Sequence, residues 1–72
     1  MKVILYTIDC PKCLVLEKKL KNKDIQFKSV KDKDLMIQLG FTEVPMLRVV
    51  SGDNSSFTDM NFTEAVQWIE EQ

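Results

Sequence analysis

The sequence predicts one α/β domain whose elements follow the order β-α-β-α-β-β-α. Three observations support this fold class. The first 30 residues read as a strand, a helix and a strand, a unit whose right-handed crossover makes the two strands parallel. A clear turn at residues 51–54 separates two short strand-like runs, and a Cys-x-x-Cys motif follows the first strand. Because 72 residues leave no room for a second core, residues 1–72 are expected to form a single domain.

The first half of the chain supplies the strand-helix-strand unit. Residues 3–6 are a continuous apolar run, typical of a central strand that is buried on both faces. From Pro11 a helix is expected to run to about residues 22–23, since apolar residues recur at helical spacing, at Cys13, Leu16 and Leu20. Residues 25–30 alternate with a period of two, which predicts a half-exposed strand.

The second half begins with a short helix, which is expected to cover residues 34–39 and to start from Asp32 or Lys33. Gly40 follows, where a left-handed residue often ends a helix. Residues 46–50 form the next strand-like run, and residues 55–58 should return antiparallel after the turn. These two strands complete the sheet and leave one helix to place.

The last helix has a recognisable start and a clear apolar face. Asn61 followed three residues later by Glu64 indicates a capping box. The apolar face that should pack on the sheet consists of Phe62, Ala65, Val66 and Ile69. Trp68 falls beside this stripe and is expected to pack at its edge.

Composition narrows the classes of function. A hydrophobic fraction of 44% and a net charge of −1 describe an ordinary soluble globule. No apolar run reaches membrane-spanning length and no signal peptide is visible, so a cytoplasmic protein without a membrane partner is expected. Because the chain has no histidine, Cys–His and Ser–His mechanisms are excluded.

Charge is unevenly distributed along the chain. Seven lysines lie between residues 18 and 33, whereas residues 49–72 hold five acids and no base. Four of the lysines fall on the outward arc of the first helix, and aromatic residues are nearly absent among them. Nucleic-acid binding is therefore not expected.

The candidate functional residues lie in the segment 7–13, Thr-Ile-Asp-Cys-Pro-Lys-Cys. On the first turn of a helix, two cysteines at this spacing come close enough to form a disulfide. Cys10 would lie at the helix N-terminus, where unpaired N–H groups and the helix dipole favour the thiolate and lower the pKa of the thiol. Pro11 fits the first helical position, and Cys13, one turn further, would be the resolving thiol.

Three structural roles compete with redox chemistry for this cysteine pair. A zinc site normally has four ligands, so two cysteines without histidine would need a dimer or outside ligands. A structural disulfide across so short a loop would contribute only about 2 kcal/mol. Two unrelated core thiols are disfavoured, because the cysteine beside Pro11 at a strand-to-helix turn is poorly placed for burial. Redox chemistry is the favoured hypothesis.

With these motifs in this order, the chain resembles the thioredoxin superfamily and, within it, the small glutaredoxins. The resemblance rests on Tyr6-Thr7 at the end of the first strand, on Cys10-Pro11-Lys12-Cys13, and on Val44-Pro45. It implies a mixed four-stranded sheet with helices on both faces. It also implies a cis proline that faces the active-site sulfurs.

The resemblance implies a monomeric thiol–disulfide oxidoreductase that needs no cofactor or metal. Cys10 thiolate would attack a disulfide in a protein substrate, and Cys13 would resolve the mixed disulfide. The charge of Lys12 is expected to favour the thiolate, whereas Asp9 should repel it and compete for the helix terminus. Val44 should offer backbone hydrogen bonds to an extended substrate segment. The expected substrate-binding residues are Pro11, Lys12, Val44 and Pro45.

The chain departs from the glutaredoxins that hold glutathione. Those proteins carry a lysine before the active-site loop, a threonine before the Val-Pro pair, and Gly-Gly with an acid after the fourth strand. This chain has Ile8-Asp9, Glu43 and residues 57–61 at these places. Three acidic residues, Asp9, Glu43 and Asp59, should therefore bring negative charge towards the groove that would hold the anionic glutathione. We therefore expect slow reduction by glutathione and faster reduction by a dithiol protein or a thioredoxin-reductase-type flavoenzyme.

Two functions of other classes remain open. A binding module that holds iron–sulfur or zinc between the cysteine pairs of two subunits would be coloured or contain metal when freshly purified. A degenerate fold kept for protein contacts would have no disulfide reductase activity.

Overall fold

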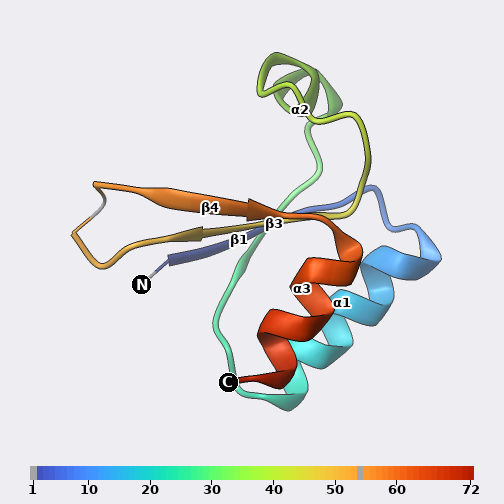
Figure 1. Ribbon diagram of the computed structural model, residues 1–72. Coiled ribbons are helices and arrows are strands. Elements are labelled where there is room, and N and C mark those ends of the chain that lie inside the picture. Colours follow the sequence, from blue (N-terminus) through green and yellow to red (C-terminus); the bar gives the residue numbers. More distant parts are fainter. Residues whose placement is uncertain (1, 54) are drawn as a thin grey trace.

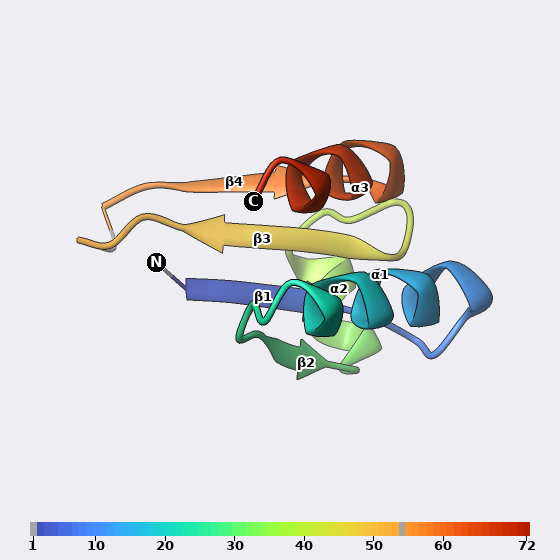
Figure 2. The same ribbon diagram turned by 90° about the horizontal axis from the view of Figure 1, so that it is seen from below.

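The computed structural model describes residues 2–53 and 55–72 and has the predicted order of elements. The elements are β1 (Lys2–Tyr6), α1 (Pro11–Asn22), β2 (Lys28–Val30), α2 (Lys33–Gln38), β3 (Met46–Val50), β4 (Phe57–Met60) and α3 (Phe62–Glu70). The strands form one sheet in the order β2-β1-β3-β4. β1 is parallel to β2 and antiparallel to β3, and β3 is antiparallel to β4 (Figure 2). The expected mixed four-stranded sheet is confirmed.

The helices lie on opposite sides of this sheet. α1 and α3 run side by side across one face, and α2 lies on the other side, near one end (Figure 1). Lys19 on α1 and Glu70 on α3 form an ion pair at 3.5 Å, and Lys23 donates to the carbonyl of Gln72. Part of the lysine-rich segment therefore contacts the acidic end of the chain. No helix in the described residues is long and apolar enough to cross a membrane.

The core fills the space between the sheet and the pair α1 and α3. Alternate residues of β1, Val3 and Leu5, point towards these helices, as the two-residue period of a strand requires. The other buried members come from the predicted helical stripes and the neighbouring strands: Leu16, Leu20, Leu47, Met60, Ala65 and Ile69. The expected capping box at Asn61 is present, and Trp68 packs at the edge of the cluster.

The opposite face of the sheet is only partly covered, because α2 has six residues. Tyr6 is buried there, but Ile4 is only half-buried, so β1 is not fully buried on both faces as predicted. Arg48 lies opposite Ile4 and stacks over the ring of Phe57, with 4.0 Å from guanidinium carbon to ring centroid. Its guanidinium also binds both carboxylate oxygens of Asp59, at 2.7 and 2.9 Å. The arginine therefore covers sheet surface that the short helix does not reach.

Two strand boundaries differ from the prediction. Only residues 28–30 of the run 25–30 pair with β1, since the N–H of Ile25 donates to the carbonyl of Leu20 and closes α1 instead. Ile25 still packs against the core without joining the sheet. β4 begins at Phe57 and not at residue 55, because the preceding residues belong to the turn, whose Asn54 lies outside the described residues.

The turn between β3 and β4 is organised by one carboxylate. Oδ1 of Asp53 accepts hydrogen bonds from the Ser51 hydroxyl at 2.6 Å, the Ser55 hydroxyl at 2.8 Å and the Ser55 N–H at 3.1 Å. These bonds to Ser51 and Ser55 favour the ionised form and lower the pKa of Asp53 to about 2.

The Asp53 turn predicts a pH dependence. Its pKa is lower in the folded chain than the ordinary value of 3.8, so its contribution to stability is complete above 3.8 and is lost as the pH falls through about 2. A carboxyl-carbon NMR titration should find Asp53 ionising near 2 and at a higher pH in Ser51→Ala. An ionisation near 3.8 in both proteins would contradict this role of the serine hydroxyl.

Candidate functional site

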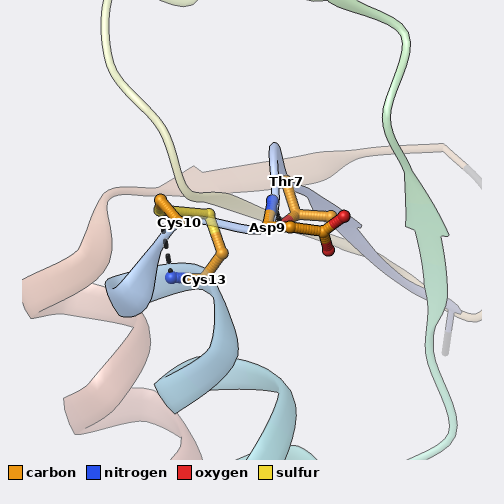
Figure 3. The surroundings of a disulfide bond; sticks show 4 residues. All are labelled: Thr7, Asp9, Cys10 and Cys13. Atoms are coloured by element: carbon orange, nitrogen blue, oxygen red, sulfur yellow. Dashed lines mark hydrogen bonds between the residues drawn. A yellow bond between two sulfur atoms is a disulfide. The ribbon is translucent and has the colours of Figure 1, made fainter.

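The candidate site begins where β1 turns into α1. Thr7 is fully buried, and its N–H donates to the carbonyl of Val30 at 3.0 Å, which extends the pairing of β1 with β2. Oγ1 of Thr7 accepts the N–H of Asp9, also at 3.0 Å. Asp9 has a φ of 60°, in the left-handed region that aspartate tolerates better than most residues. The backbone thereby turns within a few residues after β1, and Cys10 lies at the start of α1 (Figure 3).

Cys10 is the N-cap of α1, as expected. Its backbone is extended, with φ of −72° and ψ of 164°, and its Sγ accepts the N–H of Cys13 at 3.2 Å (Figure 3). The sulfur thus takes the capping position that serine or aspartate oxygens usually fill. Pro11 occupies the first helical position, and the first turn holds no acidic residue.

Cys10 and Cys13 are joined in a disulfide, with Cα atoms 5.0 Å apart. The two residues differ in access to solvent, since Cys10 is half-buried whereas Cys13 is fully buried. The described residues contain no other cysteine, and the pair is not two unrelated core thiols. An outside reactant can therefore approach the sulfur of Cys10 and not that of Cys13.

The expected competition of Asp9 for the helix terminus is wrong. The Asp9 carboxylate lies 2.9 Å from Nζ of Lys31, in the loop between β2 and α2. Figure 3 shows this carboxylate directed away from the two sulfurs. The hydrogen bond with Asp9 raises the pKa of the Lys31 ammonium, and Cys10 itself caps the helix.

The expected role of Asp59 is also wrong. Asp59 lies inside β4, opposite Arg48, and not in a loop after the fourth strand. Its ion pair with Arg48 is on the sheet face away from α1 and α3, where it raises the pKa of the guanidinium. Of the three acids expected near the site, Asp9, Glu43 and Asp59, only Glu43 lines the two hollows that share Val44.

The expected cis peptide bond is present between Val44 and Pro45, and Pro45 is fully buried. These two residues and Lys12 line one polar pocket of about 140 Å³ at the start of α3. The Lys12 ammonium lies over the ring of Phe62, 5.5 Å from its centroid. Within the described chain, neither the N–H nor the carbonyl of Val44 has a hydrogen-bond partner. Pro11 and Lys12 lie in the disulfide loop, residues 7–13, and Lys12 shares this pocket with Val44 and Pro45.

A second groove, of about 250 Å³, lies on the other side of Val44. Its lining is mainly apolar and comes from the disulfide loop, from α2 and from the segment before β3: Ile8, Met36, Ile37, Phe41 and Val44, with Lys33, Thr42 and Glu43. Ile37 is 72% exposed and Ile8 is 42% exposed. The disulfide loop therefore has an apolar groove on one side and a polar pocket on the other.

Sequence reasoning placed Thr7 in the candidate segment but missed its role, and it missed the apolar groove and Lys31 altogether. Thr7 follows a strand and precedes a turn, which is the local signal for a hydroxyl that accepts a nearby backbone N–H. The apolar groove had a weaker signal, an isoleucine on the solvent side of a very short helix. Lys31 had no local signal, because its partner Asp9 is distant in the sequence.

Within residues 2–53 and 55–72, no three cysteine, aspartate or glutamate side chains gather in a position to hold a metal ion. No known protein-family model matches the chain, and no curated protein is significantly similar to it. The fold and the geometry around the disulfide therefore carry the functional argument.

Thr7→Val should loosen the disulfide loop, because the buried hydroxyl is the acceptor for the Asp9 N–H. Loss of this partly buried hydrogen bond of the Asp9 N–H costs about 0.5–1.5 kcal/mol of stability. In amide hydrogen exchange, the Asp9 N–H should exchange faster in Thr7→Val and stay protected in Thr7→Ser, which keeps the oxygen. Equal protection in the two variants would show that the hydroxyl does not hold the loop.

Proposed function

We propose that the protein is a thiol–disulfide oxidoreductase with a thioredoxin-like fold of the small glutaredoxin type. The observation that carries the proposal is the disulfide between a half-buried cysteine at a helix N-cap and a fully buried cysteine one turn later. The strand order β2-β1-β3-β4 and the order of the elements along the chain support this topology. The proposed enzyme works as a monomer in the cytoplasm.

The reaction starts from the reduced pair. Cys10 thiolate attacks one sulfur of a substrate disulfide, forms a mixed disulfide and expels the other substrate sulfur as a thiolate. Cys13 then attacks Sγ of Cys10, the Cys10–Cys13 disulfide forms, and the second substrate sulfur leaves. Two electrons and two protons pass from the protein dithiol to the substrate. A thiol donor, either a thioredoxin-reductase-type flavoenzyme or glutathione, restores the reduced pair.

The helix terminus supplies the activation that a histidine would supply elsewhere. The N–H of Cys13 points at the Cys10 sulfur at 3.2 Å, and the positive end of α1 lies at the same atom. Both favour a thiolate over a neutral thiol at Cys10. The first turn of α1 holds no acidic residue, so no carboxylate within that turn opposes this effect.

The geometry supports an extended protein segment as substrate. The free N–H and carbonyl of Val44 can pair with a substrate backbone, as at the edge of a sheet. The apolar groove beside Val44 can hold a substrate side chain against Ile8, two residues before Cys10. Glutathione has only short polar groups on either side of its cysteine and gains little from such a groove.

The roles of the two cysteines give the main test. Cys10→Ser should abolish disulfide reduction, whereas Cys13→Ser should accumulate a mixed disulfide, because only Cys10 is accessible for the first attack. Mass spectrometry of each variant after incubation with a disulfide-containing protein measures this. Alkylation of the reduced protein that labels Cys13 before Cys10 would reverse the assignment.

The apolar groove gives a second test. Ile37→Lys should lower kcat/KM for a disulfide-containing protein about tenfold, as expected for the loss of one apolar contact, and should leave a small hydrophilic disulfide unaffected. Stability should change little, since Ile37 is 72% exposed. Val15→Lys is the matched control, because Val15 is exposed on α1 and lines neither groove. An equal loss for both substrates would exclude this role of the groove.

A further inference from the structure

One ion pair ties the disulfide loop to a distant part of the chain. Asp9, directly before Cys10, binds Nζ of Lys31 at 2.9 Å. Lys31 follows β2, whose pairing with β1 brings it next to the loop. The side chains of Lys31 and Asp9 are 61% and 51% exposed, so the pair contributes little to global stability. Any effect on the chemistry must therefore be local.

Two contacts set the direction of the Asp9 side chain. Its N–H is held by Oγ1 of Thr7, which fixes the left-handed backbone, and its carboxylate is held by Lys31. The carboxylate is directed away from the sulfurs as a result (Figure 3). Without Lys31, an unpaired negative charge would remain on the residue next to the Cys10 thiolate. Like charges at that separation oppose each other, and the thiolate would become less stable.

We infer that Lys31 is a positioning residue of the redox site, which holds the Asp9 carboxylate away from Cys10 and offsets its charge there. The inference rests on the proposed function in one respect, namely that Cys10 thiolate is the reacting group. It assigns a role to a residue outside the Cys-x-x-Cys motif and its groove. The reactivity of Cys10 is thereby linked to the loop between β2 and α2.

Other charged groups near the disulfide loop also influence the pKa of Cys10, but they are the same in every protein of a test on Asp9 and Lys31. The pKa of the Lys31 ammonium is raised mainly by Asp9 and, to a smaller extent, by Glu17. Lys12 stacks over Phe62, and Lys33 and Glu43 line the apolar groove. A double-mutant cycle on Asp9 and Lys31 cancels these contributions, because they are the same in all four proteins.

The test is a thiolate-absorbance titration of Cys10 in the full chain carrying Cys13→Ser, so that one thiol ionises. Lys31→Gln should raise the pKa of Cys10 by about half a unit, the size expected for one exposed neighbouring charge. Asp9→Asn alone should lower it by less than the same change does in the Lys31→Gln protein, since Lys31 directs that charge away from Cys10. Asn also tolerates the left-handed backbone. The double variant should return to the starting value.

Two controls separate this effect from nonspecific changes of charge. Lys28→Gln removes an exposed lysine from β2, and Asp24→Asn changes the other left-handed aspartate, at φ 56°. Neither should move the pKa of Cys10. The inference is overturned if Lys31→Gln shifts the pKa no more than Lys28→Gln, or if Asp9→Asn lowers it equally with and without Lys31.

The same preparations distinguish this inference from the proposed function. The titration needs no substrate, so it reports on Lys31 whether or not the protein reduces disulfides. A Cys10 pKa that follows the expected cycle in a protein without reductase activity would support the role of Lys31 and reject the proposed function. A protein that reduces disulfides but shows no coupling between Asp9 and Lys31 would support the proposed function and reject the role of Lys31.

Discussion

The end of β1 is the constraint on which the site depends. β1 has hydrogen-bonded partners on both sides, and Thr7 extends this pairing by one further bond to Val30. The chain must then turn and begin α1 at Pro11. The hydroxyl of Thr7 and the left-handed Asp9 make this turn short. Because the strand is fixed and the turn is short, the position of the Cys10 sulfur is fixed as well.

Sheet order then assembles the rest of the site. β3 lies antiparallel beside β1, with Met46 opposite Tyr6, so the start of β3 meets the end of β1. The segment Val44–Pro45 reaches the disulfide loop for this reason, although it is distant in the sequence. The two grooves beside Val44 are made by residues from both loops and from the helices next to them. A site of this kind needs the complete sheet.

The sequence predicts best what local interactions decide. Helix spacing, the capping box at Asn61 and proline at position 11 act within one or two turns, and the structure confirms them. The strand boundaries are less predictable, because Ile25 and Ser55 have alternative hydrogen-bond partners, one at the end of α1 and one in the Asp53 turn. The partners of Asp9 and Asp59 depend on tertiary structure, so their expected roles were wrong.

These two corrections change the electrostatic picture of the site. Asp9 and Asp59 are each bound by a cation, which leaves Glu43 opposed by Lys12 and Lys33 along the grooves. A surface with such mixed charge neither strongly attracts nor strongly repels an anion as small as glutathione. If the protein acts as proposed, discrimination between substrates must then come from contacts that one substrate makes and another lacks. Under the proposed function, an extended protein segment would find such contacts in the apolar groove and at the N–H and carbonyl of Val44, which have no partner within the described residues.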